Sequence, residues 1–161
     1  MTVNAIYYQP GTAIAFKDSG GDVAFAIASC SNGAGYASAQ YDRSTGNKPA
    51  RYKVDFICKW VNAPTLGDIC RLYMFASQQS SYDNAAGAVT PETKFSNYAL
   101  IGQAVCSVAA DQAFYYSCVV EIYGRYIQFG IWNTSAKAMN ATGNASSVTI
   151  TPIPDDIEAA A

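Results

Sequence analysis

The stretch "YKVDFICKW", residues 52–60, decides the fold class because apolar and polar side chains alternate along it with a period of two. Its apolar set is Tyr52, Val54, Phe56, Cys58 and Trp60. The positions between them hold Lys53, Asp55 and Lys59. Successive side chains of a β-strand point to opposite faces, so the pattern predicts a strand with one buried face and one polar face.

The next segment, "DICRLYMFA", residues 68–76, predicts a second strand that is buried on both sides. Pro64 and Gly67 in the connection favour a turn, so residues 51–76 are predicted to form an antiparallel pair. One face of the second strand carries Ile69, Tyr73 and Phe75, and the other carries Cys70, Leu72 and Met74. Because both faces are apolar, we expect both to be covered.

Further strand-like segments flank this pair along the whole chain. They span residues 12–16, 22–28, 35–42, 98–108, 113–123, 125–132 and 146–153. No window shows a convincing helical stripe, and Pro152 with Pro154 is expected to end the last strand. Eight or nine strands at intervals of roughly a dozen residues are typical of an all-β antiparallel sandwich, here one domain over residues 1–161.

Two segments stand outside this strand pattern. Residues 77–97 form a long connection of polar and small residues, and connections of this length in compact domains are usually functional or disordered. The prolines of residues 152–161 favour an extended path that does not easily continue a sheet. This C-terminal segment either lies across a neighbouring subunit, with Ile153 and Ile157 as anchors, or is a frayed terminus.

Composition limits the partners that we expect. Ten Lys and Arg residues stand against 12 Asp and Glu residues, scattered along the chain, which argues against nucleic-acid binding. Residues 1–9 lack the features of a signal peptide, and no apolar run approaches the roughly 20 residues that cross a bilayer. We therefore expect a soluble, cytosolically made chain, and its 14% of charged residues hints at surfaces covered by partners.

The chain offers little for catalysis or metal binding. It has no histidine, so a serine or cysteine nucleophile lacks its usual base, and it has no phosphate-binding or dinucleotide motif. Its cysteines, predicted to be mainly buried free thiols, are Cys30, Cys58, Cys70, Cys106 and Cys118. We expect no catalytic residue, cofactor or metal, no enzyme activity, and no small-molecule ligand. The 12 tyrosines fit either a sugar-binding or protein-binding surface or the filling of wide sheet faces.

Asn133, Thr134 and Ser135 formally satisfy the glycosylation sequon. Glycosylation also requires a secretory route, for which the sequence gives no sign. We interpret Asn133 and Thr134 as turn residues that close the strand beginning at Arg125.

Four stretches, taken in order, resemble a family of small virion structural proteins of tailed bacteriophages. They are "AIAFKDSGGDVAFAIASCSNGAGYASAQYD", "RYKVDFICKWVNAPTLGDICRLYMFAS", "VVEIYGRYIQFGIWNTSAKAM" and "VTITPIPDDI". The most specific pieces are the turn at residues 33–35, the pair at 125–126 that opens a strand, and residues 152–155. The resemblance covers most of the chain outside residues 77–97.

This resemblance implies a β-sandwich of jelly-roll type that decorates or cements the exterior of a capsid. The implied partners are the major capsid protein and further copies of this chain, as a trimer at local symmetry axes. Within the long connection and the C-terminal segment, the expected contact residues are Tyr82, Thr90, Pro91, Phe95, Pro152, Ile153, Pro154 and Ile157. Two alternatives remain: an adaptor or fibre-associated protein of the tail or neck, and a lectin that binds host glycans.

Overall fold

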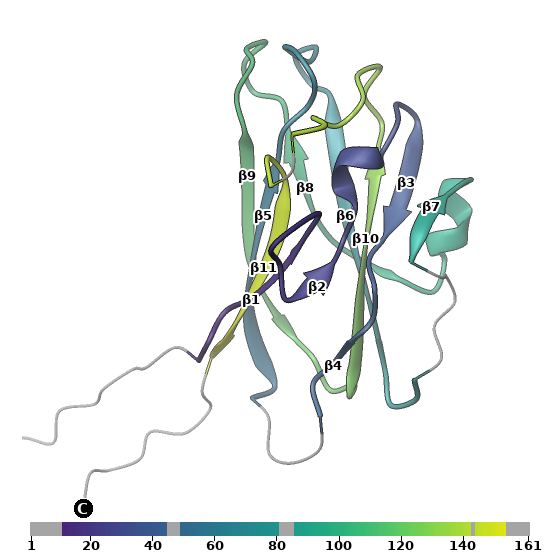
Figure 1. Ribbon diagram of the computed structural model, residues 1–161, viewed down its shortest axis with the longest axis vertical. Coiled ribbons are helices and arrows are strands. Elements are labelled where there is room, and N and C mark those ends of the chain that lie inside the picture. The colour runs from purple at the N-terminus through teal and green to yellow at the C-terminus, as the bar shows by residue number, and fades with distance from the viewer. Residues whose placement is uncertain (1–10, 45–48, 81–85, 143, 154–161) are drawn as a thin grey trace, which may run out of the picture.

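A computed structural model shows an all-β chain built from two mostly antiparallel sheets (Figure 1). It describes residues 11–44, 49–80, 86–142 and 144–153. The strands are β1 (Ile14–Lys17), β2 (Val23–Ala24), β3 (Ala34–Ala37), β4 (Tyr41–Asp42), β5 (Arg51–Cys58), β6 (Ile69–Ser77), β7 (Gly87–Val89), β8 (Ala99–Val105), β9 (Phe114–Glu121), β10 (Tyr126–Asn133) and β11 (Ser147–Ile153). Two short 3-10 helices, η1 (Ile27–Ser29) and η2 (Glu92–Phe95), complete the elements. None of the helices in these ranges is long and apolar enough to span a membrane.

The two sheets pack on each other around one main core. The five-stranded sheet has the order β2-β1-β11-β5-β9, and the six-stranded sheet has the order β7-β3-β10-β6-β8 with β4 beside β10. The ring of Phe16 on β1 meets the ring of Phe129 on β10 edge to face at 4.9 Å. This contact joins the two layers, because each ring comes from a different sheet.

The alternation in β5 is confirmed. All five apolar side chains from Tyr52 to Trp60 are buried in the core, and β5 lies between β11 and β9. The prediction that both faces of β6 are covered is also confirmed, because Cys70, Leu72 and Met74 enter the core while the opposite face is half-buried. The predicted antiparallel pair over residues 51–76 is wrong, because β5 pairs with β11 and β9 in one sheet while β6 pairs with β10 and β8 in the other. The connection between the two strands therefore crosses from one sheet to the other. Alternation correctly gave the inward side of β5, whereas both faces of β6 are apolar and the pattern did not distinguish them.

The sheets approach each other most closely at β8 and β9. Tyr116 on β9 donates a hydrogen bond from its hydroxyl to the carbonyl oxygen of Ile101 on β8, at 2.8 Å. A Cβ atom at Gly102 would lie 1.9 Å from the Tyr116 ring, so glycine makes this approach possible. The last strand of each sheet therefore lies on the same side of the molecule (Figure 1).

The long connection at 77–97 contains secondary structure that we did not predict. Strand β7 pairs with β3, and η2 lies on the outer face of the six-stranded sheet (Figure 1). Buried residues form a second apolar cluster there, with Ala37, Val89, Phe95 and Tyr98 as its centre. Tyr73, Phe75 and Trp132 pack against it. The described part of the connection thus covers the second apolar face of β6 and β10.

Two of the predicted strands are broken. Residues 22–28 form β2, parallel to β1, followed by η1. The Ile27 amide donates a hydrogen bond to the Phe25 carbonyl oxygen at 2.7 Å, which turns the chain, and both side chains are buried. Residues 35–42 divide into β3 and β4 around Ser38, which is buried and whose hydroxyl accepts a hydrogen bond from the Phe129 amide at 3.0 Å. The described part of the chain thus contains eleven strands, of which β2 and β4 have two residues each.

Strand β11 runs to Ile153, where the predicted strand also ends, but Pro152 lies inside the strand and does not end it. Pro152 pairs with Tyr52 inside β11, and its carbonyl oxygen accepts a hydrogen bond from the Gly11 amide at 3.1 Å. The nitrogen and carbonyl of one strand residue point the same way, so the Pro152 nitrogen, which carries no hydrogen, points towards Gly11 and away from β5. No hydrogen bond to β5 is lost. The ladder with β5 therefore continues to Ile153.

Candidate functional site

The large apolar side chains that are exposed belong mainly to two strands and to the segments next to them. Within the described residues they are Val61, Leu66, Leu100, Val105, Val108, Tyr115, Val119 and Tyr123. They belong to β8, to β9, to the segments that adjoin these strands, and to the connection between β5 and β6. We call β8 and β9, with their exposed side chains Leu100, Val105, Tyr115 and Val119, the apolar edge.

The four side chains of the apolar edge lie on both flanks of the molecule. Leu100 and Val105 pair with Tyr73 and Ile69 of β6, which places them on the outer face of the six-stranded sheet. Tyr115 and Val119 pair with β5 residues on the outer face of the five-stranded sheet. Their exposed fractions are 54% for Leu100, 41% for Val105, 73% for Tyr115 and 54% for Val119. A partner that binds around the apolar edge would contact apolar side chains on the outer faces of both sheets.

The main chain along the apolar edge is also open to pairing. β8 has seven residues and β9 has eight, and each is the last strand of its sheet. At the other ends of the two sheets, β2 has two residues and β7 has three. Short strands, lysines and prolines protect sheet edges from unwanted pairing. Neither β8 nor β9 contains lysine, arginine or proline, and Glu121 is the only charged residue in the two.

Polar groups adjoin the β9 flank. The Ser117 hydroxyl donates to a carboxylate oxygen of Asp55 at 2.7 Å, and the Lys53 ammonium lies 3.0 Å from the same carboxylate. Tyr123 donates from its hydroxyl to Glu121 at 2.7 Å. An apolar centre with a polar rim is the usual composition of a protein interface.

The predicted contact residues that the structure describes lie apart from this surface. Thr90 and Pro91 are exposed and follow β7, at the opposite end of the six-stranded sheet from β8. Phe95 is only 2% exposed, because its ring fills the second apolar cluster, and this burial leaves it no surface for a partner. Pro152 and Ile153 are half-buried in β11. Tyr82, Pro154 and Ile157 lie outside the described residues.

The sequence held a signal for the apolar edge that we did not use. The outward row of β9 is Tyr115, Ser117, Val119 and Glu121, so its one charge stands at the end of the strand. The corresponding row of β5 carries Lys53 and Asp55 near its middle. An outward row in an edge strand with no charge along its middle indicates a contact surface, but the sequence alone does not show that β9 is an edge.

Arg43 is a second feature that sequence reasoning missed. Its side chain is 6% exposed and lies beside a hollow of about 560 Å³ near β1, β4 and β5. It donates hydrogen bonds to the Tyr52 hydroxyl at 3.1 Å, to the carbonyl oxygens of Ile122 and Gly124 at 2.7 Å each, and to that of Pro49 at 2.6 Å. The guanidinium thus ties β5 to the segment that follows β9, which is a structural role.

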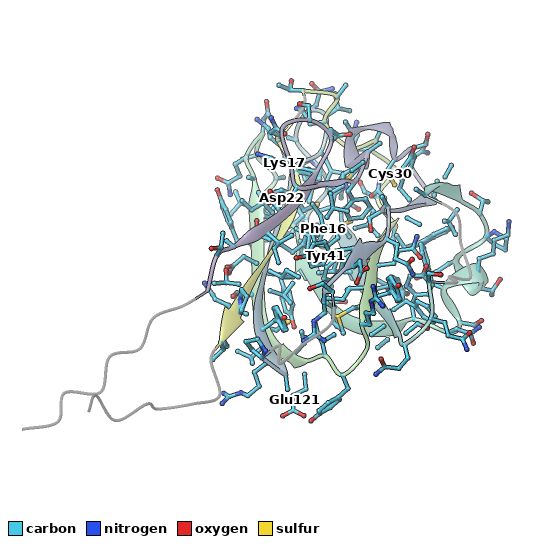
Figure 2. The ribbon with its side chains drawn as sticks, turned by 60° about the horizontal axis from the view of Figure 1, so that its bottom comes forward. Phe16, Lys17, Asp22, Cys30, Tyr41 and Glu121 are labelled. Carbon is cyan, nitrogen blue, oxygen red and sulfur yellow. The ribbon has the colours of Figure 1, made fainter. Side chains whose placement is uncertain are left out.

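Side chains at the rim of this hollow make contacts with other residues of the chain. Tyr41 lies beside Phe16 at its edge, with Asp22 nearby (Figure 2). Burial raises the pKa of the Tyr41 hydroxyl. Asp22 accepts a hydrogen bond from the Ala15 amide at 2.8 Å, so its carboxylate is occupied in holding the chain around β1.

Asn133 is buried, and it also takes part in the turn after β10 that we predicted, because its side-chain oxygen accepts a hydrogen bond from the Ser135 amide at 3.1 Å. It is the last residue of β10, and its side-chain oxygen accepts a hydrogen bond from the Trp60 indole at 2.9 Å. Its amide nitrogen donates to the carbonyl oxygens of Ser31 and Lys137 at 3.1 and 2.7 Å. These bonds satisfy a polar group inside the core and leave it inaccessible for modification.

The cysteines are free thiols, and four of the five are buried. Burial raises the pKa of the Cys30 thiol to about 12. A hydrogen bond with Cys58, followed by burial, raises the pKa of Cys70 well above its usual value. Protonated thiols are poor nucleophiles and poor metal ligands. Within the described ranges, no group of three or more Cys, Asp or Glu side chains is arranged to hold a metal ion.

Comparison of the chain with models of protein families and with curated proteins finds no match.

Proposed function

We propose that this protein is a structural subunit of a phage virion that binds the exterior of the capsid through its apolar edge. In this proposal the two sheets form a sandwich of jelly-roll type, and the protein decorates and stabilises the shell without catalysing a reaction. The observation that supports a binding function is the gathering of exposed apolar side chains on β8, β9 and the adjoining segments. The resemblance in the sequence supports the choice of a virion as the assembly.

The apolar edge suits a partner that stays bound. Exposed apolar patches on soluble domains mark interaction surfaces, and burying them removes apolar area from water. The open edges of β8 and β9 can also accept hydrogen bonds from a partner strand. A subunit that binds the assembled shell and not its separate components stabilises the shell by mass action, and many repeated contacts add to this effect.

The test uses the β8 flank of the apolar edge. The double variant Leu100→Lys with Val105→Lys should bind purified capsids that lack this chain at least about tenfold more weakly, because charges would replace apolar contacts. Thr93→Lys, an exposed change on η2, is the matched control and should bind normally. Co-sedimentation with the capsids measures occupancy. Unchanged saturation by the double variant, or absence of the chain from purified virions, contradicts the proposal.

A tail or neck location is the first alternative, and copy number distinguishes it from the shell. Quantitative mass spectrometry of intact virions should find hundreds of copies for a capsid protein. A tail or neck protein should be present in about a dozen copies or fewer, since such parts have low rotational symmetry.

A glycan-binding function is the second alternative, and exposed tyrosines favour it. Tyr123 is exposed and its hydroxyl lies 2.7 Å from Glu121, which places an aromatic ring beside a fixed carboxylate. Such pairs can stack on a sugar ring and bind its hydroxyls. A glycan array without hits would exclude this alternative.

A further inference from the structure

We infer that β9 pairs with β9 of a second copy of this chain, antiparallel, across a two-fold axis beside Ser117. The inference deepens the proposed binding role of the apolar edge, of which it names one occupant. It does not depend on whether the assembly is a virion. It follows from the length of β9, from the lack of protective residues and from the order of its outward side chains.

An edge strand that pairs with its own copy must be long and unprotected. β9 has eight residues, and among the described strands it pairs with β5 alone, on one side. It contains no lysine, arginine or proline, and its single charge, Glu121, is at its end. Antiparallel pairing of two identical edges has two-fold symmetry, so that each contact occurs twice. Two five-stranded sheets would then join into one continuous sheet.

The outward side chains of β9 match each other when the axis passes beside Ser117. Tyr115 of one copy then lies opposite Val119 of the other, and the same pair repeats across the axis. An aromatic ring opposite a β-branched side chain is a favourable cross-strand pair. Ser117 lies opposite its own copy, where two small hydroxyl side chains fit. Both exposed apolar residues of β9 are thereby covered.

Moving the axis by one residue removes this match. With the axis beside Cys118, Tyr115 would lie opposite Glu121, and Ser117 would lie opposite Val119. Apolar side chains would then face polar ones. With the axis beside Ser117, Glu121 lies opposite Ala113, just outside the strand, so that no two like charges are directly opposed. Glu121 already lies at the rim of the molecule (Figure 2), where it accepts the hydrogen bond from Tyr123.

The first experiment places charges on the proposed axis. Sedimentation equilibrium of the full chain at millimolar concentration should give the mass of a dimer. Ser117→Lys alone and Ser117→Glu alone should each be monomeric, because the axis sets two like charges opposite each other. Their equimolar mixture should restore the dimer, since Lys then lies opposite Glu. Ser96→Lys, an exposed change beyond η2, is the control and should remain dimeric.

Each of the other outcomes overturns the inference. A monomeric wild-type chain contradicts the β9 pairing. A trimer, the state that the family resemblance implies, contradicts it too. Dimers that persist equally in both charged variants show that the contact lies elsewhere. Thermal unfolding of each variant confirms that it is folded, which matters for Ser117→Glu because Asp55 lies nearby.

The second experiment reports the register. In Ser117→Cys the two new thiols would face each other, and oxidised glutathione, as the electron acceptor, should convert them into a disulfide between copies. Non-reducing electrophoresis detects this product. The wild-type chain, with its half-buried Cys118, is the control and should not cross-link. Cross-linking of the wild type through Cys118, with none in Ser117→Cys, places the axis at Cys118 and overturns the proposed register.

The two proposals fail separately. A dimer that passes both tests but does not bind capsids contradicts the virion function and leaves the β9 pairing intact. Capsid binding that depends on Leu100 and Val105, by a chain that remains monomeric, contradicts only the β9 pairing.

Discussion

The outer face of β6 and β10 and the apolar edge are both apolar regions outside the main core, yet within the described residues only the first is covered. The outer face is covered by β7, η2 and Tyr98, all of which come from the chain between β6 and β8. The segment between β8 and β9 is much shorter and leaves the edge exposed. A chain can cover its own apolar surface only where a connection is long enough to return across it. What remains exposed is available to another molecule.

The covering segment is fixed by both packing and polar contacts. The rings of Phe95 and Tyr73 stack with 5.1 Å between their centroids. Glu92 in the first turn of η2 accepts hydrogen bonds from the Arg71 guanidinium at 2.7 Å and from the Tyr73 hydroxyl at 2.5 Å. Tyr98 donates a hydrogen bond to the buried Gln128 side chain. The side chains of the apolar edge are exposed to solvent. Substitutions there should therefore change the free energy of unfolding less than substitutions in the covering segment.

The largest expected effect is that of Phe95→Ala. Removing this buried ring opens a cavity against β6 and β10, and we expect a loss of about 3 to 5 kcal/mol in the free energy of unfolding. Leu100→Ala at the apolar edge is the control and should change it by less than about 0.5 kcal/mol. Urea unfolding measures both. Equal costs at the two positions would show that the covering segment does not seal the face.

Gly130→Ala should have an intermediate effect. A Cβ atom at Gly130 would lie 2.3 Å from the Phe95 ring, so the substitution should cost about 1 to 3 kcal/mol through overpacking. In a Phe95→Leu background the same change should cost less, because the aromatic ring that blocks the space is gone. The double-mutant cycle in urea tests this coupling. Strict additivity would mean that Phe95 does not limit the space beside Gly130.

The smallest expected effect is a loss of stability in alkali through Tyr73. Burial, together with the hydrogen bond to Glu92, raises the pKa of the Tyr73 hydroxyl to about 12. The unfolded chain has a tyrosine pKa of about 10, so this stabilisation is complete below that pH and is lost as the pH rises towards about 12. At neutral pH the free energy of unfolding of wild type should therefore be larger than that of Tyr73→Phe by on the order of 1 kcal/mol.

The difference between wild type and Tyr73→Phe is measured by urea unfolding across this alkaline range. This difference in the free energy of unfolding should become smaller as the Tyr73 phenol loses its proton. Both proteins contain the same other tyrosines and the same lysines, so the titration of those groups does not contribute to the difference. A difference that stays constant across the range would show that ionisation of Tyr73 does not weaken its contact with η2.

Several features could be predicted from the sequence because they depend on neighbouring residues. Strands β5, β6 and β9 were predicted from their apolar patterns, and in β5 alternation also gave the inward face. Residues 22–28 alternate as a strand does, yet the chain turns at the hydrogen bond between the Ile27 amide and the Phe25 carbonyl oxygen, which alternation does not report. The turn at Asn133 was predictable because its partner Ser135 is nearby, whereas its bond to Trp60 joins distant segments.

The sequence by itself determined the all-β class, most of the strands and the inward side of β5, because a period of two is a local property of the backbone. Only the tertiary structure decided which sheet each strand joins and which apolar surfaces are covered. Phe95 became a core residue because Gly35 and Gly130 leave space for its ring on a distant pair of strands. Tyr115 and Val119 became exposed because no described segment covers the outer face of β9. Burial on the second face of a strand depends on contacts between distant segments, which periodicity does not encode.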